Sequence, residues 1–257
     1  LVLLACANSL DHMGKPEEAL TMYKRGQEAA PRDHQLWYNE GVTLSGLKRY
    51  EEALISFQRA AAIDPKHASS HNAIARLEAG RGERVPAVLA FARFLIVEPE
   101  GARAKANLPL LMQTMEGNVE RTGKKNITIR VDASRLPAEG DTTRRVNDFT
   151  TQELMLALLT ASDMDKKNKK KSPSERFTEK MDMLIGLLDN TDGKQSGFYW
   201  EHYVPFFQGL KENGHLHAAT MVMQATSDDP DVSKWLRSNE PPVKALYAWC
   251  RNYAWPE

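Results

Sequence analysis

The densest group of potential metal ligands in the sequence lies at residues 201–217 and contains Glu201, His202, His215 and His217. Imidazole nitrogens and carboxylate oxygens are ligands that zinc accepts. His215 and His217 are two residues apart, however, and side chains at that spacing point to different sides of a helix. The spacing disfavours a metal site, and we expect neither a metal nor another cofactor.

Motifs for catalysis are missing from the sequence, which has no nucleotide-binding loop, nucleophile elbow or zinc-protease motif. Gly80-Arg81-Gly82 has two closely spaced glycines but lacks the rest of a dinucleotide fingerprint, so we interpret it as a turn between helices. We therefore predict that the chain is not an enzyme and that its functional residues bind.

One strong run of charge, Lys166–Lys171, stands between two predicted helices. We interpret it as a solvated loop, and the alternative is an anion-binding patch for nucleic acid or a membrane surface. No aromatic residues for base stacking are interleaved with these lysines. Over the whole chain 34 acidic residues balance 34 basic ones, so no net charge favours nucleic acid. We expect no nucleic-acid partner.

Length and composition fit a globular protein, with 257 residues of which 42% are hydrophobic and 26% charged. No apolar run reaches the roughly 18 residues that a membrane span needs. The two cysteines, Cys6 and Cys250, are expected to be small helix-packing residues. The chain begins at Leu1 instead of methionine, so we expect a trimmed or mature product. The cytoplasm is favoured, and the periplasm or secretion stays open.

The elements that must position the binding residues follow a recurring proline. Pro31, Pro65 and Pro99 are each 34 residues apart. The central copy has its characteristic residues in the order Trp37, Gly41, Tyr50, Ala53, Phe57, Ala60 and Pro65. Small residues suit the crossing of two antiparallel helices, aromatic residues fill the space around it, and a proline ends the second helix. This pattern closely resembles the tetratricopeptide repeat.

The resemblance covers roughly residues 1–99, with residues 101–115 as a closing helix. The first and third copies carry Ala19, Tyr23 and Pro31, and Ala87, Phe91 and Pro99. Three copies are about the minimum for a stable stack. Glu40 stands where the family usually has leucine, and His71 where it usually has an aromatic residue. The resemblance implies an all-α solenoid that binds other proteins.

Residues 117–145 differ in composition from the repeats. Asn126–Asp132 alternates apolar and polar residues and predicts a short strand, with Thr142–Val146 as its partner in a hairpin. This segment would serve as a connector, or its exposed edge would capture an extended peptide.

The helical period returns at Val146. Thr150–Glu153 and Ser172–Glu175 both have the sequence of a capping box. Asn213–Ala219 repeats the form of Gly14–Ala19, which predicts a diverged repeat at about 198–228.

We therefore predict an all-α fold, a tetratricopeptide-repeat solenoid with a short β hairpin or strand insertion and a helical C-terminal block. Its domains are residues 1–116 (three repeats and the closing helix), 117–145 (the connector) and 146–257 (the C-terminal helices).

Two aromatic residues, Tyr253 and Trp255, lie at or beyond the last predicted helix. They would either fold back onto that helix or form an exposed patch. An exposed patch would mark a surface for a partner or for a homodimer.

The resemblance also implies which residues bind, because the first helix of each pair lines the concave groove where family members hold a peptide or a partner helix. Aligning the copies by their prolines gives the expected groove residues: Asn8, Asp11, Gln35, Tyr38, Asn39, Val42, Ser69, Asn72, Arg76, Arg103 and Asn107. Asparagine suits such a surface because its amide both donates to and accepts from a peptide backbone.

Two of these asparagines, Asn8 and Asn39, fall where chaperone-binding members of the family place asparagines of a carboxylate clamp. The basic residues of that clamp are replaced here by Leu4, Ser69 and Ala73. We therefore do not predict a chaperone C-terminus as the ligand.

The sequence thus predicts a noncatalytic scaffold that binds another protein or peptide in the groove. One alternative is a ligand-binding or enzymatic module in the C-terminal helices, with the repeats as a docking domain. Self-association is a further alternative.

Overall fold

The computed structural model describes residues 2–122, 126–130, 145–164, 171–190 and 193–256. They form two compact units, one ending at Arg81 and the other covering Gly82–Pro256. Both units consist mainly of α-helices, so the predicted all-α fold class is confirmed. No helix in these ranges is long and apolar enough to cross a membrane. The predicted domain boundaries at residues 116 and 145 stay predictions.

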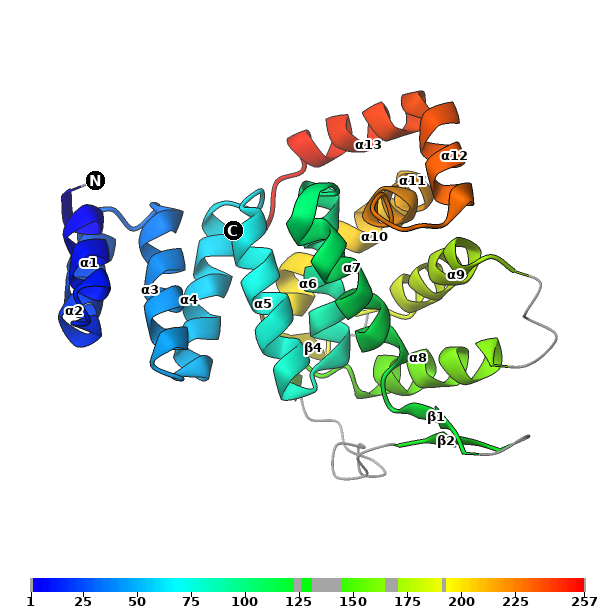
Figure 1. Cartoon of the computed structure of the whole chain (residues 1–257), viewed down its shortest axis with the longest axis horizontal. Coiled ribbons are helices and arrows are strands. Elements are labelled where there is room, and N and C mark those ends of the chain that lie inside the picture. The colour runs from blue at the N-terminus through cyan, green and yellow to red at the C-terminus, as the bar shows by residue number, and fades with distance from the viewer. Residues whose placement is uncertain (1, 123–125, 131–144, 165–170, 191–192, 257) are drawn as a thin grey trace. The chain divides into compact units, whose positions relative to one another are not determined.

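The N-terminal unit is a series of antiparallel helices joined by short turns. Its helices are α1 (Val2–His12), α2 (Pro16–Ala29), α3 (His34–Gly46), α4 (Tyr50–Ile63) and α5 (Ala68–Arg81). Each helix packs on the next one, and short turns send the chain back along the helix that it has just left (Figure 1).

The turns inside the first two helix pairs have the same geometry. Gly14 and Lys48 adopt left-handed backbone angles, with φ of +73° and +61°. The following amides donate back to the end of the first helix, Lys15 to the Leu10 carbonyl at 3.0 Å and Arg49 to the Leu44 carbonyl at 2.9 Å. This hydrogen bond satisfies a carbonyl at the helix end and reverses the chain. Lys48 occupies, 34 residues after Gly14, a conformation that glycine adopts without strain.

Close approach of the helices depends on glycines that contact large side chains. A Cβ atom on Gly41 would lie 2.7 Å from the Phe57 ring, and one on Gly26 would lie 2.6 Å from a Leu36 methyl group. Both distances are shorter than a carbon contact allows. The predicted role of Gly41 at the crossing of α3 and α4 is therefore confirmed in atomic detail.

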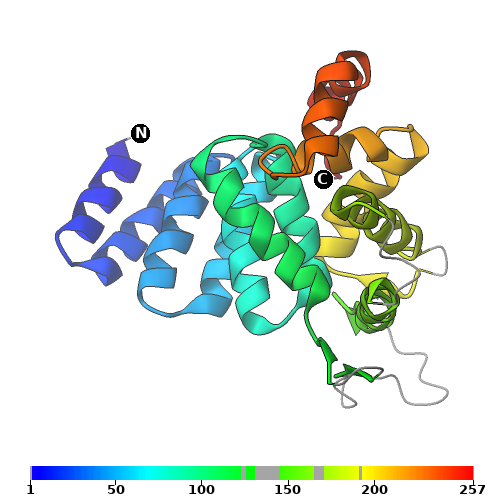
Figure 2. The ribbon, with the colours of Figure 1, turned by 45° about the vertical axis from the view of Figure 1, so that its right-hand side comes forward.

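The C-terminal unit is built around α6 (Arg84–Val97), in which every residue from Arg84 to Ile96 is buried. α6 packs against α7 (Gly101–Glu116), α8 (Thr150–Asp163) and α11 (Leu216–Met223). α8 and α9 (Pro173–Gly186) lie side by side, as both views show (Figure 1, Figure 2).

A buried arginine fastens the first turn of α6 to its neighbours. The Arg84 guanidinium donates to the carbonyls of Thr114 (3.1 Å) and Met115 (2.7 Å) at the end of α7. The Arg84 backbone amide donates to a carboxylate oxygen of Glu153 on α8 at 3.1 Å. Burial lowers the pKa of Arg84, and the Glu153 carboxylate opposes that shift. Arg84 therefore supplies donors to carbonyls that the helix leaves unsatisfied at its C-terminus.

The predicted strand is present, but its predicted partner was wrong. β2 (Ile127–Ile129) pairs antiparallel with β1 (Val119–Arg121), with Val119 opposite Ile129. The connection between these strands is short, so the hairpin closes at a lower entropic cost than pairing with Thr142–Val146. Residues 142–144 lie outside the described ranges. β3 (Arg145–Val146) pairs in parallel with β4 (Gln195–Ser196).

The two predicted capping boxes had different outcomes. At α9 the box is formed, because Ser172 and Glu175 each accept a hydrogen bond from the other residue's backbone amide. At α8 the prediction was wrong. There Asp148 accepts hydrogen bonds from the Thr150 amide (2.9 Å) and hydroxyl (2.6 Å), and Glu153 is engaged by Arg84.

The rest of the C-terminal unit is a five-residue π-helix, η3 (Tyr199–Tyr203), followed by α10 (Val204–Glu212), α11, α12 (Pro230–Ser238) and α13 (Glu240–Asn252). The turn between α10 and α11 repeats the geometry seen at Gly14. Gly214 has φ of +71°, and the His215 amide donates to the Leu210 carbonyl at 2.8 Å. The diverged repeat at about 198–228 stays a prediction, which this geometry favours.

The chain end folds back onto the aromatic core. Trp255 is only 8% exposed, and its ring lies 5.1 Å from Tyr203 and 5.3 Å from His202. Tyr253 packs on Phe206 at 5.3 Å. Of the two alternatives for Tyr253 and Trp255, the exposed patch was therefore wrong. Since these rings are used inside the chain, a homodimer through a C-terminal aromatic surface is not supported.

Candidate functional site

The expected binding residues of the N-terminal unit lie on the first helices of the pairs. We call them the first-helix surface: Asn8 and Asp11 on α1, Gln35, Tyr38, Asn39 and Val42 on α3, and Ser69, Asn72 and Arg76 on α5. All nine residues are half-buried or exposed, so none of them lies in the core.

Helix α3 shows most clearly how the sequence separates this surface from the core. Leu36 and Leu44 are buried against the neighbouring helices. Tyr38, Asn39 and Val42 follow the spacing of the other face, and Val42 is 44% exposed. Residues three or four apart are neighbours on a helix, so these three side chains form one continuous strip.

Aromatic rings join α3 to the beginning of α5. The His67 ring lies 4.7 Å from His34 and 4.8 Å, edge to face, from Tyr38. Tyr38 also contacts the Phe57 ring at 5.5 Å. His67 is fixed by a 2.7 Å hydrogen bond between its Nδ1 and the Ser70 hydroxyl. These contacts hold the Tyr38 ring in one place on the first-helix surface.

The asparagines of the first-helix surface differ in how much of their amide is already used. Asn8 accepts a 2.8 Å hydrogen bond from the Tyr23 hydroxyl. The amide oxygen of Asn72 is buried and accepts no hydrogen bond from the described residues. Asn39 is half-buried, and its amide makes no hydrogen bond within the described ranges. Asn39 therefore has both its donor and its acceptor available to a partner.

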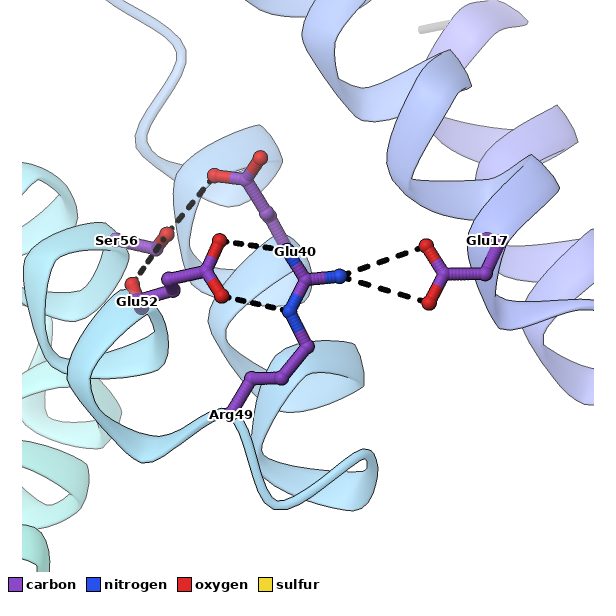
Figure 3. A network of polar contacts seen from close by, with 5 residues as sticks. All are labelled: Glu17, Glu40, Arg49, Glu52 and Ser56. Atoms are coloured by element: carbon purple, nitrogen blue, oxygen red, sulfur yellow. Dashed lines mark hydrogen bonds and ion pairs between the residues drawn. The ribbon is translucent and has the colours of Figure 1, made fainter.

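An arginine at the start of α4 ties the first two helix pairs together (Figure 3). Arg49 donates two hydrogen bonds of 2.6 Å to Glu52 and reaches the Glu17 carboxylate on α2 at 3.4 Å. The fork geometry lowers the pKa of Glu52 and raises that of Arg49, in each case chiefly through their hydrogen bonds. These ion pairs are exposed, so we expect them to orient the helices and to contribute little to the stability of the fold.

Glu40 occupies the core position on α3 where the family usually has leucine. It is buried, and one of its carboxylate oxygens accepts hydrogen bonds of 2.9 Å from Gln27 on α2 and from Ser56 on α4. The Ser56 bond is visible in Figure 3. A buried carboxylate needs such partners. Glu40 thereby fixes three helices relative to one another from behind the first-helix surface.

The last two expected residues, Arg103 and Asn107, belong to α7 in the C-terminal unit. Arg103 is exposed, pairs with Glu98, and has its guanidinium 5.6 Å from the centre of the Phe94 ring. Asn107 is 1% exposed, and its amide donates to the Arg103 carbonyl at 2.9 Å. Expecting Asn107 on an accessible surface was therefore wrong, because its side chain is turned back onto its own helix.

The three positions where a carboxylate clamp would have basic residues carry uncharged side chains. Leu4 is buried in the core of the N-terminal unit, and Ser69 and Ala73 are half-buried on α5.

Two residues of this region, His34 and His67, were not predicted from the sequence. The signal available was the spacing of 33 residues between them, close to the period of the repeat, which places both near the start of a first helix. Cys6 also differs from its prediction, since it is exposed on α1 instead of packed between helices.

Comparison with known proteins agrees with this geometry. The family model for the tetratricopeptide repeat matches residues 34–67. The Hsp70-Hsp90 organizing protein of Triticum aestivum is 26% identical over 104 residues, which are 40% of this chain and 18% of that protein. The chain thus matches less than a fifth of the length of this relative.

A solved structure of the first tetratricopeptide-repeat domain of Spaghetti (RPAP3), bound to the HSP90 peptide SRMEEVD, is similar at 23% identity with a TM-score of 0.42. The match covers 45% of this chain and 94% of that one. This likeness is too distant to transfer a binding geometry. The matched segment at residues 34–67 coincides with α3, α4 and the turn that follows, and this helix pair is therefore a tetratricopeptide repeat.

Proposed function

We propose that the N-terminal unit is a noncatalytic scaffold that binds an extended peptide or a helix of another protein along the first-helix surface, in the concave groove of the solenoid. The observation that carries the proposal is the strip on α3. There Asn39, an amide that makes no hydrogen bond within the described residues, directly follows Tyr38, whose ring is held by its neighbours, and lies one helical turn before the exposed Val42.

Each part of this strip suits recognition of a polypeptide. A carboxamide donates to and accepts from a peptide bond at the same time, whatever the partner's side chains are. The Tyr38 ring offers a large contact area at a low entropic cost, because neighbouring rings already hold it. Val42 adds apolar area that binding removes from water. The exposed Arg76 on α5 supplies positive charge for an acidic side chain of the partner.

The same surface disfavours capture of a C-terminal carboxylate. Capture of a C-terminal carboxylate requires cations. The positions that carry these cations in chaperone-binding relatives are occupied here by Leu4, Ser69 and Ala73. We therefore propose an internal peptide segment or a helix as the ligand.

Affinity capture with matched variants tests the proposal. The native chain, the double variant Asn39→Ala/Val42→Asp and the control Ile55→Asp would each be immobilised and exposed to lysate of the source cells. Ile55 lies on α4 and is 59% exposed, so its substitution alters an equally accessible aliphatic residue on a second helix. We expect a protein that the native chain and the control retain and the double variant loses. Equal retention by all three chains would place the binding surface elsewhere.

A ligand-binding module in the C-terminal helices remains a second candidate. The observation in its favour is a pocket between α7 and α9.

A further inference from the structure

The pocket between α7 and α9 lies entirely within the C-terminal unit and has a volume of about 190 Å³. Its walls are largely apolar, formed by Met112 and Met115 from α7 and by Pro173 and Phe177 from α9. Met115 and Phe177 are buried and fix the shape of the inner wall. Met112 is half-buried, and its flexible side chain can adapt to a ligand.

Two basic side chains of α9, Arg176 and Lys180, also line this pocket. Lys180 is already neutralised, since its ammonium group lies 2.8 Å from a carboxylate oxygen of Asp163 on α8. Glu116 of α7 also lines the pocket and lies 4.0 Å from Lys180. Its side chain is 62% exposed, so water and salt screen its charge.

The Arg176 guanidinium has a different kind of partner from Lys180. Its Nη1 donates to the Lys171 carbonyl at 2.7 Å, and it forms no ion pair with a carboxylate of the described residues. A guanidinium has five N–H donors in a planar fork that matches a carboxylate. The pocket therefore combines an apolar wall with a cation that retains donors for an anion.

The first amides of α9 do not contribute to this positive charge, because other groups occupy them. The Ser174 amide donates to Asp229 at 3.1 Å, and the Glu175 amide donates to the Ser172 hydroxyl at 3.2 Å. An anion in the pocket would thus bind to Arg176 and not to the end of the helix.

We infer that this pocket binds a small aromatic carboxylic acid. The aromatic ring lies against Met112, Met115 and Phe177, and the carboxylate pairs with Arg176. The size agrees for the ring, because an apolar cavity of roughly 150 Å³ is large enough for benzene. The short chain places the acid group at the half-buried Arg176. A cationic ligand is disfavoured by Arg176, and a purely apolar ligand would cover the guanidinium without giving it a partner.

This site is independent of the first-helix surface, since all its residues belong to the other unit. Failure of one proposal therefore leaves the other intact.

The test uses 3-phenylpropionate as the probe and its neutral analogue 3-phenylpropanamide as the comparison, with dissociation constants measured by ligand-observed NMR on the full chain. The variants are Arg176→Gln, which removes the charge, and Met112→Trp, which fills the pocket. Arg59→Gln, an exposed arginine of α4, is the control. Circular dichroism and thermal melting confirm that each variant is folded.

We expect the native chain and the control to bind the acid at least tenfold more tightly than the amide. Arg176→Gln should remove this difference, and Met112→Trp should abolish binding of both compounds. The inference is overturned if the acid does not bind, if acid and amide bind equally to the native chain, or if Arg176→Gln has no effect. Tighter binding of N-acetyl-Phe-Asp-amide than of the free acid would also overturn it, in favour of a peptide side chain as the natural occupant.

Discussion

The Tyr23 hydroxyl donates a hydrogen bond of 2.8 Å to the amide oxygen of Asn8 and joins the two helices of the first pair. Tyr23 is 1% exposed, and burial raises its pKa. Asn8 lies on the surface that we propose for the partner, yet its oxygen already serves the fold. One of the two acceptor sites of the Asn8 oxygen is therefore occupied, whereas the whole amide of Asn39 is available to a partner.

A double-mutant cycle should detect this hydrogen bond as stability. We expect Asn8→Ala and Tyr23→Phe each to lower the free energy of unfolding by about 1 kcal/mol, because each removes one partner of a partly buried hydrogen bond. The double variant should lose less than the sum of the two single changes. Urea denaturation measures all four proteins. Strict additivity would show that the two groups are not coupled in solution.

The glycine at the crossing of α3 and α4 should tolerate no side chain. Gly41→Ala places a methyl group 2.7 Å from the Phe57 ring, and we expect a loss of about 1–3 kcal/mol from overpacking. Gly46→Ala is the matched control in the same helix, since a Cβ there meets nothing within 4 Å. It should be neutral or stabilising, because alanine favours a helix over glycine. Chemical denaturation of both variants gives the comparison, and an equal effect would refute the role of Phe57.

The repeat was predictable because its determinants are steric and local. Gly41 and Phe57 are 16 residues apart in one helix pair, and the prolines mark each pair at a constant period. The predictions that were wrong depended on contacts that the sequence pattern does not encode. The strand at Ile127 has a nearer partner than expected, and Asn107 has the spacing of a surface residue but turns onto its own helix.

Glu40 is a second residue whose environment could not be predicted from the sequence. A carboxylate at a core position looks unfavourable in the sequence, and it is tolerated because Gln27 and Ser56 arrive from two other helices to donate to it. Only the fold brings those three residues together.

The buried thiol of Cys250 should make stability depend on pH. Burial raises the pKa of Cys250 despite the opposing charge of Arg93, so the folded state disfavours the thiolate. The stability from this shift is complete below the ordinary thiol pKa of about 8.5 and is lost as pH rises through the folded value. We therefore expect the free energy of unfolding to fall between about pH 8 and 9.5, where the tyrosines do not yet titrate.

Denaturation of two alanine variants over this pH range checks the assignment. Cys250→Ala should flatten the pH dependence, and Cys6→Ala, at the exposed cysteine of α1, is the control for the loss of a thiol. An unchanged slope in Cys250→Ala would contradict the assignment.

The absence of basic clamp residues leads to a prediction about the peptide SRMEEVD, which the Spaghetti domain binds. We expect the native chain to bind this peptide with a dissociation constant above about 1 mM. That value corresponds to a binding free energy of about 4 kcal/mol. The double variant Ser69→Lys/Ala73→Arg places two cations on α5 beside the existing asparagines and should gain measurable affinity that salt weakens. Isothermal titration calorimetry distinguishes the two proteins. Micromolar binding by the native chain would show that the clamp is not needed here.

Site-specific photocrosslinking tests the central claim most directly. A benzophenone amino acid replaces either Val42 on the first-helix surface or Ile55 on α4, two exposed aliphatic residues on different helices of the same pair. Each protein is irradiated in source-cell lysate, and crosslinked chains are identified by mass spectrometry. We predict one discrete partner crosslinked from position 42, suppressed by excess native chain and not seen from position 55. The same partner captured from position 55 alone, or no partner from either position, would contradict the proposal that this surface binds a protein.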